Sequence, residues 1–191
     1  MSPKSKQQNE LIKVGRKHEI SATALKLFAE NGFQHTTISA IAKEAGIAKG
    51  LLYNYYDSKE ALIKEIIISE LHQFTNLFDS NNDGILTAEE FEFFIKNTIA
   101  TLKKNPEHWK LYFAAFLQKD VLQILRHELE AKLMPQYLIL IDYYRRKGET
   151  NPEAAALLLT ATLDGISLNY IHAPDAYPLE ALGELILQKF K

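Results

Sequence analysis

The sequence has 191 residues, with 22 Lys and Arg against 24 Asp and Glu and a formal net charge of −2. Hydrophobic residues make up 47% and charged residues 24%, which is typical of a globular protein and excludes disordered and fibrous classes. Cysteine is absent, which excludes disulfide scaffolds, cysteine zinc sites and thiol catalysis. The polar start and the lack of an apolar run of about 18 residues predict a cytoplasmic protein without a signal peptide or a membrane span.

Charge is distributed unevenly along the chain. The first 60 residues carry nine Lys and Arg against six acids, whereas the remaining residues carry 13 against 18. Any basic surface that faces a partner is therefore expected near the N-terminus. The lysines between Lys4 and Lys17 could add contacts to phosphate, or they could belong to a disordered arm.

Apolar residues recur at helical spacing through most of the chain. The stripe of Ile20, Ala24, Leu27 and Phe28 predicts a first helix that ends near residue 31, with Gly32 as its stop signal. Short helices are expected over residues 37–46 and 48–55, followed by a longer helix after residue 58. A turn-rich stretch at residues 79–84 comes next.

The second half of the chain continues the helical pattern. Helices are expected over residues 87–104, from residue 108 onwards, over residues 152–172 and over residues 178–190. Interruptions are expected at Pro106, at Pro135 and at residues 148–152, because proline and glycine end helices. No segment has a convincing strand pattern, so the predicted fold class is all-α.

Residues 36–59 have the pattern of a helix-turn-helix. Gly46 permits a left-handed turn between two short helices, and Ala42 and Ala45 are small where the helices would cross. The outward residues of the second helix are short or form hydrogen bonds, which suits a major groove about 12 Å wide. Those residues are Lys49, Gly50, Tyr53 and Asn54.

The same segment resembles the TetR/AcrR family of bacterial transcriptional repressors. The resemblance is carried by Thr37, Ile41, Ala42, Ala45-Gly46-Ile47, Gly50, Leu52-Tyr53, Tyr55-Tyr56 and Lys59. It implies a homodimer that binds double-stranded operator DNA through an N-terminal three-helix domain, residues 1–58. It also implies a helical C-terminal domain, residues 59–191, that binds a small-molecule effector and dimerises.

Roles for individual residues follow from this resemblance. Thr37, Tyr53, Tyr55 and Lys59 are expected to contact phosphates, and residues 49–51 to lie nearest the base edges. Tyr53 and Tyr55 could instead pack inside the small domain, and Lys59 could be only solvated, whereas Tyr56 is expected in the core. The full set of candidate DNA-contacting residues is Thr36, Thr37, Ala48, Lys49, Gly50, Leu51, Tyr53, Asn54, Tyr55 and Lys59.

Residues 79–90 fit the calcium-loop pattern of an EF-hand at every specified position. Oxygen ligands would come from Asp79, Asn81, Asp83, the carbonyl of Ile85 and a bidentate Glu90. The alternative is structural, because Asp, Asn and Gly favour loops and Thr87 with Glu90 forms a capping box for the next helix. Calcium is therefore a candidate cofactor, and no other cofactor is expected.

The C-terminal half is expected to hold an apolar effector pocket and a dimer surface. The candidate pocket residues, which could equally be core packing, are Trp109, Tyr112, Phe116, Tyr137, Tyr144, Asn169 and Tyr170. The candidate dimer residues include Leu158, Leu159, Gly165, Ile166 and Asn169, with Leu179, Leu182, Ile186 and Phe190 from the last helix. The alternative is that these two helices only close the core.

These observations predict a DNA-binding transcriptional regulator, and the resemblance implies a repressor that a small-molecule effector releases from DNA. A calcium-binding regulator that uses residues 79–90 is the alternative. An enzyme is not expected, because the sequence contains no G-x-S-x-G, phosphate-loop or H-E-x-x-H motif.

Overall fold

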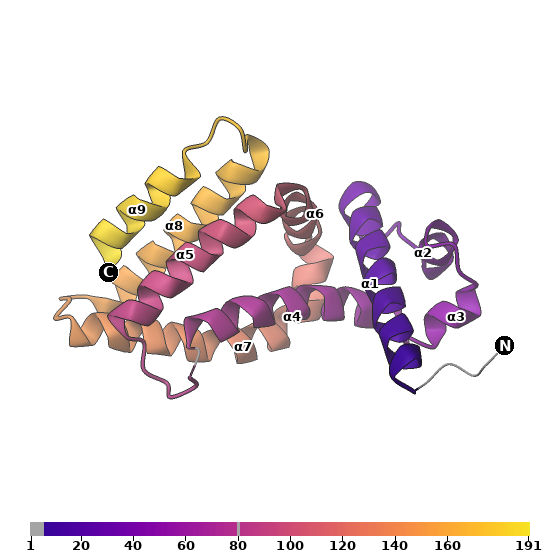
Figure 1. Cartoon of the computed structure of the whole chain (residues 1–191), viewed down its shortest axis with the longest axis horizontal. Helices are drawn as coiled ribbons and strands as arrows, with labels where there is room; N and C mark the ends of the chain where they lie inside the picture. Colours follow the sequence, from indigo (N-terminus) through magenta and orange to yellow (C-terminus); the bar gives the residue numbers. More distant parts are fainter. Residues whose placement is uncertain (1–5, 80) are drawn as a thin grey trace. The chain divides into compact units, whose positions relative to one another are not determined.

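The computed structural model describes residues 6–79 and 81–191, with the backbone alone for residues 6–10, 73 and 74. The described residues form helices and no strands, so the all-α prediction is confirmed (Figure 1). The predicted lysine arm lies partly outside the described residues. The helices are α1 (Lys6–Asn31), α2 (Ile38–Glu44), α3 (Lys49–Tyr53), α4 (Lys59–Phe78), α5 (Ala88–Lys104), α6 (Pro106–Phe116), α7 (Lys119–Arg146), α8 (Pro152–His172) and α9 (Leu179–Phe190).

The chain divides into two compact units. The first comprises the residues up to Ile67 together with Ala114–Leu125, and the second comprises Ile68–Phe113 and Arg126–Lys191. Helices α4 and α7 therefore each contribute residues to both units.

The core of the first unit follows the apolar stripe predicted for α1. Ile20, Ala24 and Phe28 are fully buried, and Phe33 packs its ring 5.4 Å from that of Phe28. Gly32 takes a positive φ of 81°, which a helix stop requires and which glycine adopts without strain. The predicted end of this helix is therefore confirmed.

Gln118 joins the start of α7 to the end of α1 within the first unit. Its side-chain oxygen accepts a hydrogen bond from the backbone N–H of Phe33 at 2.7 Å. Its side-chain nitrogen donates to the backbone carbonyls of Phe28, at 2.8 Å, and Ala114, at 3.0 Å. One amide thus provides the partner of the Phe33 N–H beyond the end of α1 and adds a second bond to the carbonyl of Phe28, which also accepts the N–H of Gly32.

The second unit is built around α5, α8 and α9. Helix α9 packs against both α5 and α8 (Figure 1). At Gly183 of α9, an added Cβ atom would lie 3.1 Å from Cγ1 of Ile99 on α5, so the small residue allows the close approach. Phe91 of α5 stacks on Tyr143 of α7 with ring centroids 5.2 Å apart.

Two predictions about individual helices need correction. Pro135 lies inside α7 and does not interrupt it. Proline removes one backbone hydrogen bond, but Pro135 and Ala131, four residues earlier, are both exposed, so water can solvate the carbonyl that loses its partner. Helix α8 is also long and apolar enough to span a membrane by length and composition alone, contrary to our expectation, and about a third of its apolar window is buried inside the protein.

Candidate DNA-binding site and ligand cavity

The helix-turn-helix is built from α2, α3 and the turn between them. The side chain of Thr37 accepts a hydrogen bond from the backbone N–H of Ala40 at 3.1 Å and so caps the start of α2. Gly46 takes a positive φ of 63°, and the next residue, Ile47, donates its backbone N–H to the carbonyl of Ala42. Ile41 and Ala42 are buried, which fixes α2 against α1.

Most of the predicted DNA-contacting residues are accessible at this element. Leu51 and Tyr53 remain 39% and 45% exposed although both are large and hydrophobic, which leaves them available to a partner. The ammonium group of Lys49 lies 5.9 Å from the ring centroid of Tyr53. The exposed members of the predicted set are Thr37, Ala48, Lys49, Gly50, Leu51, Tyr53 and Asn54, and Tyr55 and Lys59 are partly exposed.

Thr36 is the exception in the predicted DNA-contacting set. Its side chain is buried, and its hydroxyl donates to the carbonyls of Leu27 at 3.1 Å and Gly32 at 2.9 Å. A buried hydroxyl that is already bonded to the end of α1 has no access to phosphate. The structure therefore assigns Thr36 to the joint between α1 and α2, and our expectation for this residue is corrected.

Lys59 has partners within the chain. Its ammonium group donates to the carbonyls of Phe33 at 2.7 Å and Gln34 at 3.4 Å, and it lies 4.2 Å from the ring centroid of Phe33. An ammonium group has three N–H donors, so two bonds to carbonyls leave one for a phosphate. Lys59 thus holds the start of α4 against the end of α1.

Tyr56 follows α3 in the chain and takes part in a small polar network. Its hydroxyl is 3.0 Å from that of Ser21 and 3.3 Å from the carboxylate of Glu65, which also pairs with Lys17 at 2.6 Å. Burial, and to a smaller degree the charge of Glu65, raises the pKa of Tyr56 to about 12, while the bond from Ser21 opposes that shift. The prediction that Tyr56 belongs to the core is confirmed, because it is 3% exposed.

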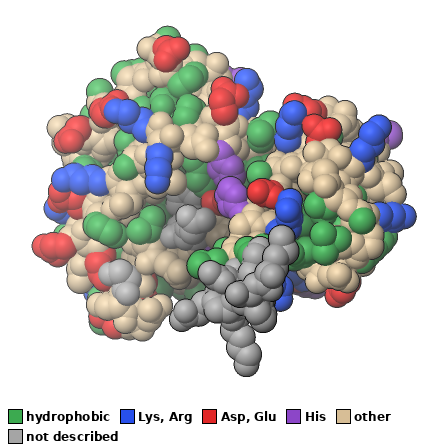
Figure 2. Space-filling model, turned by 45° about the vertical axis from the view of Figure 1, so that its right-hand side comes forward, with side chains coloured by type: hydrophobic (Ala, Val, Ile, Leu, Met, Phe, Trp, Pro, Cys, Tyr) green, Lys and Arg blue, Asp and Glu red, His purple; other side chains and the backbone are tan. Residues whose placement is uncertain are grey.

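Charges of both signs are mixed on the visible face of the molecule (Figure 2). Lys and Arg side chains alternate there with Asp and Glu rather than gathering in one large patch. This distribution agrees with the net charge of −2.

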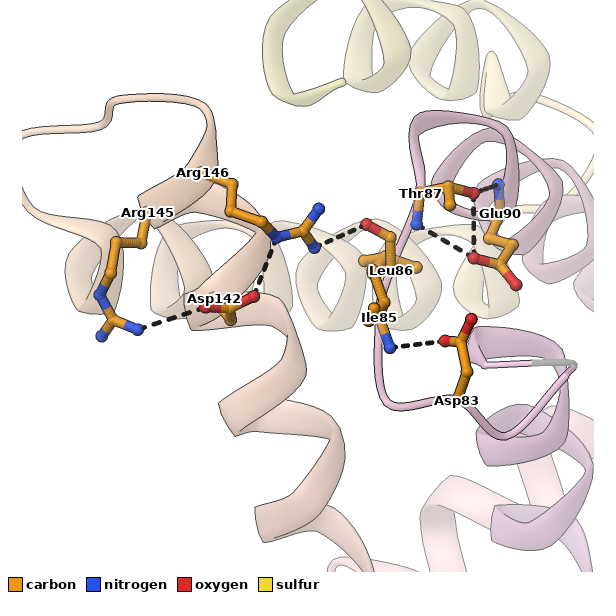
Figure 3. Close-up of polar contacts among 8 residues, drawn as sticks. All are labelled: Asp83, Ile85, Leu86, Thr87, Glu90, Asp142, Arg145 and Arg146. Atoms are coloured by element: carbon orange, nitrogen blue, oxygen red, sulfur yellow. Dashed lines mark hydrogen bonds and ion pairs between the residues drawn. The ribbon is translucent and has the colours of Figure 1, made fainter.

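The loop between α4 and α5 is held by its own side chains. Asp79 accepts the backbone N–H groups of Asp83 at 3.2 Å and Gly84 at 3.0 Å, and Asp83 accepts that of Ile85 at 2.8 Å. Arg146 of α7 donates to the carbonyl of Leu86 at 2.9 Å, which ties the loop to α7 (Figure 3).

The prediction of a calcium site in this loop has no support. A carboxylate oxygen of Glu90 accepts from both the backbone N–H and the hydroxyl of Thr87, at 3.0 and 2.9 Å, and so completes the capping box at the start of α5 (Figure 3). Among the described residues, no group of three or more His, Cys, Asp or Glu side chains is placed to hold a metal ion. The carboxylates of the loop therefore serve to fix its backbone.

A cavity of about 510 Å³ lies within the second unit, between α4, α5, α7 and α8. Its walls are mainly leucine, methionine and phenylalanine, as is usual for sites that bind small apolar molecules. The lining residues are Leu71, Thr75, Phe78, Phe94, Leu129, Glu130, Leu133, Met134, Gln136, Tyr137, Leu140, Leu157, Leu159, Thr160, Leu163 and Asp164.

Of the predicted pocket residues, only Tyr137 lines this cavity. Trp109, Tyr112, Tyr144 and Tyr170 are at least nine-tenths buried and pack in the core, with the indole N–H of Trp109 bonded to the carbonyl of Thr101. The side-chain nitrogen of Asn169 donates to the carbonyl of Gly165 in its own helix, and Phe116 also does not line the cavity. The alternative of core packing thus describes these aromatic residues better.

The sequence did contain one signal for the cavity. Asp164 is the only charged residue between Glu153 and His172 in an otherwise apolar helix, and it lines the cavity. An isolated acid in such a segment indicates that the face of the helix that carries it is a candidate binding site.

Residues 20–66 match the family model described as bacterial regulatory proteins, tetR family. The chain is 23% identical over 178 residues to the fatty acid metabolism regulator protein of Bacillus subtilis, covering 89% of this chain and 91% of that protein. It is 47% identical over 55 residues to the HTH-type transcriptional repressor KstR2 of Rhodococcus jostii, which covers 29% of this chain and 27% of that protein.

Solved structures match over nearly the whole chain. FadR from Bacillus subtilis in complex with stearoyl-CoA gives a TM-score of 0.71 at 23% identity, covering 91% of this chain and 96% of that one. FadR from Bacillus halodurans gives a TM-score of 0.70 at 21% identity, with the same coverage. At this identity the likeness concerns the fold.

The chain is therefore a DNA-binding transcriptional regulator. Residues 20–66, which include its helix-turn-helix, match the tetR family model, in agreement with the resemblance predicted from residues 36–59.

Proposed function

We propose that this chain is a cytoplasmic, non-catalytic repressor that binds operator DNA as a homodimer and releases it when a small-molecule effector occupies the α4–α5–α7–α8 cavity. The observation that carries the proposal is that the residues from Ala48 to Tyr53 are exposed, except for the buried Leu52. The helix-turn-helix that presents them has its own buried apolar residues, such as Ile41. The division of functions between residues 1–58 and 59–191 is part of this proposal.

On DNA, the exposed residues take two roles. Thr37, Tyr53, Tyr55 and Lys59 donate to phosphates and fix the register of the domain on the duplex. Lys49, Gly50 and Leu51 lie nearest the base edges, with Ala48 and Asn54 beside them. Thr36 is left out of this set because it is buried.

Dimerisation is proposed through α8 and α9. Leu158 on α8 is 59% exposed and Leu185 on α9 is 43% exposed, which is a large amount of leucine surface for two helices that pack together. The predicted dimer residues Leu159, Ile166, Leu179 and Ile186 are buried within the chain instead, so they belong to its core. A two-fold contact through α8 and α9 would bury these exposed leucines on both subunits.

The effector role rests on the cavity and on one relative. The cavity is large enough for a molecule of drug size and mostly apolar. The Bacillus subtilis FadR structure holds stearoyl-CoA, which supports an effector with a long apolar part.

The proposal is tested by fluorescence anisotropy on labelled DNA from upstream of the gene for this protein. We expect saturable binding, two chains per operator, and an affinity that falls steeply as salt rises. A shuffled duplex of the same composition is the control and should bind at least about 1000-fold more weakly at the same salt. Equal affinity for both duplexes would overturn the assignment.

A further inference from the structure

The charges that line the cavity are all of one sign. Glu130 on α7 and Asp164 on α8 contribute carboxylates, and none of the described lining residues is Lys, Arg or His. The remaining polar lining comes from Thr75, Gln136, Tyr137 and Thr160, none of which carries a charge at neutral pH.

Asp164 is exposed, lines the cavity and has no charged partner among the described residues. Burial raises its pKa, and no described residue forms an ion pair or a hydrogen bond with its carboxylate. Its side chain nevertheless remains accessible. A carboxylate held among apolar side chains without a partner gains more from an approaching cation than it would in water, because the surroundings screen the attraction less.

Gln136 adds a second unfilled acceptor. Its side-chain oxygen is buried and accepts no hydrogen bond from any residue that the structure describes. A buried carbonyl oxygen without a donor is costly, so a ligand with an N–H group would relieve that cost. Gln136 and Asp164 thus favour the same chemistry in a ligand.

We propose that the effector is a lipophilic organic cation, such as a protonated amine, whose apolar part fills the cavity and whose charge lies against Asp164. The proposal rests on the proposed function, since it names the ligand class of that same cavity. A fatty acid carboxylate would place a third negative charge in a cavity already lined by Glu130 and Asp164, and like-charge repulsion disfavours that arrangement. The stearoyl-CoA in the FadR structure and the effector of this protein would then have only an apolar part in common.

The test uses three probes with one common apolar body. Decylamine is a cation at pH 7, decanol is neutral and decanoate is an anion, so their affinities separate charge from chain length. Isothermal titration of the full-length protein, with each probe below its critical micelle concentration, measures the three dissociation constants. We expect decylamine to bind about tenfold more tightly than decanol, and decanoate to bind more weakly than both.

Two variants locate the effect. Asp164→Asn removes the charge with little change of shape and should abolish the preference for decylamine while leaving the affinity for decanol unchanged. Asp175→Asn is the matched control, because Asp175 is exposed and does not line the cavity. All three affinities should be the same in Asp175→Asn as in the parent protein.

The outcomes separate this inference from the proposed function. Decanoate binding as tightly as decylamine, or a preference for decylamine that survives in Asp164→Asn, would overturn the cationic effector while the cavity remained a ligand site. Failure of all three probes to bind would overturn both the ligand class and the effector role of the cavity. The anisotropy experiment on operator DNA is independent of these titrations and reports on DNA binding alone.

Discussion

The side-chain oxygen of Gln118 accepts the backbone N–H of Phe33 across 85 residues of sequence. The backbone carbonyl of Phe33 also accepts a hydrogen bond from Lys59. Side chains at the start of α4 and just before α7 therefore both bind this residue, which follows the end of α1. Because Phe33 is 3% exposed, its backbone groups have little access to water and depend on these side chains. The position of the DNA-binding helices is therefore tied to a polar joint as well as to apolar packing.

Gln118→Met should destabilise the protein by about 2 kcal/mol, since it leaves the buried N–H of Phe33 without a partner and removes one of the two hydrogen bonds to the carbonyl of Phe28. Urea unfolding followed by circular dichroism measures the change. Gln123→Met, at an exposed position on α7, is the control and should change stability by less than about 0.5 kcal/mol. Equal stabilities for both variants would show that the amide of Gln118 contributes nothing.

Gly50→Ala should separate DNA binding from folding. Gly50 lies in α3 without a positive φ, and an added Cβ would meet no atom within 4 Å. Alanine should therefore stabilise the fold by about 0.5 kcal/mol while weakening operator binding at least tenfold, because its methyl group obstructs the close approach of the backbone to DNA.

Gly15→Ala is the matched control for Gly50, because Gly15 is also helical and also has open space around its Cβ position. We expect a similar gain in stability and no loss of affinity. If Gly50→Ala binds operator DNA as the parent does, Gly50 is not at the interface.

Leu158→Glu should dissociate the proposed homodimer. A carboxylate in an apolar interface would be buried without a partner, so the dimer dissociation constant should rise by at least about 100-fold. Sedimentation at micromolar concentration measures the change. Leu11→Glu, at a leucine that is 73% exposed on α1, should leave the assembly intact. A parent protein that sediments as a monomer would refute the dimer outright.

Tyr56 should make the stability of the protein depend on pH above 10. Burial raises its folded pKa to about 12, above the unfolded value of about 10, so the stability it contributes is complete below pH 10 and is lost as the pH rises to 12. The loss should reach about 2 kcal/mol. Urea unfolding between pH 9 and 12 should show a shallower decline for Tyr56→Phe than for the parent, and parallel declines would contradict the assignment.

Thr87→Val tests the structural role of the loop before α5. The substitution keeps the shape of the side chain but removes the hydroxyl that accepts the backbone N–H of Glu90. The free energy of unfolding should fall by about 1 kcal/mol. Thermal unfolding in the presence of a chelator measures the effect without any contribution from metal ions. Thr150→Val, at an exposed position before α8, should unfold as the parent does.

The fold of the first unit could be predicted from local sequence signals. Gly32 and Gly46 both adopt the positive φ that their positions require, and Ile20, Ala24 and Phe28 of the predicted stripe are fully buried. Such features depend on a few neighbouring residues and on helical periodicity, so no distant contact is needed to anticipate them. The joint at Gln118 was missed because it depends on residues 85 and 90 positions away.

The cavity could not be predicted in the same way. Periodicity shows which face of a helix is apolar, but not how completely the facing side chains fill the space between helices. Trp109 and Tyr112, which were expected at the pocket, pack in the core instead, with ring centroids 5.4 Å apart. The cavity is lined in part by Leu133 and Met134, and both side chains remain more than 40% exposed.

Two adjacent leucines on α8 connect the cavity to the outer surface. Leu157 lines the cavity, and Leu158, the next residue, is exposed on the helix and belongs to the proposed dimer contact. Because both belong to one turn of a rigid helix, a ligand that moves Leu157 also moves Leu158. Thermodynamic linkage requires any such coupling to be mutual: in the proposed dimer, ligand affinity would depend on protein concentration and the monomer–dimer equilibrium would depend on ligand.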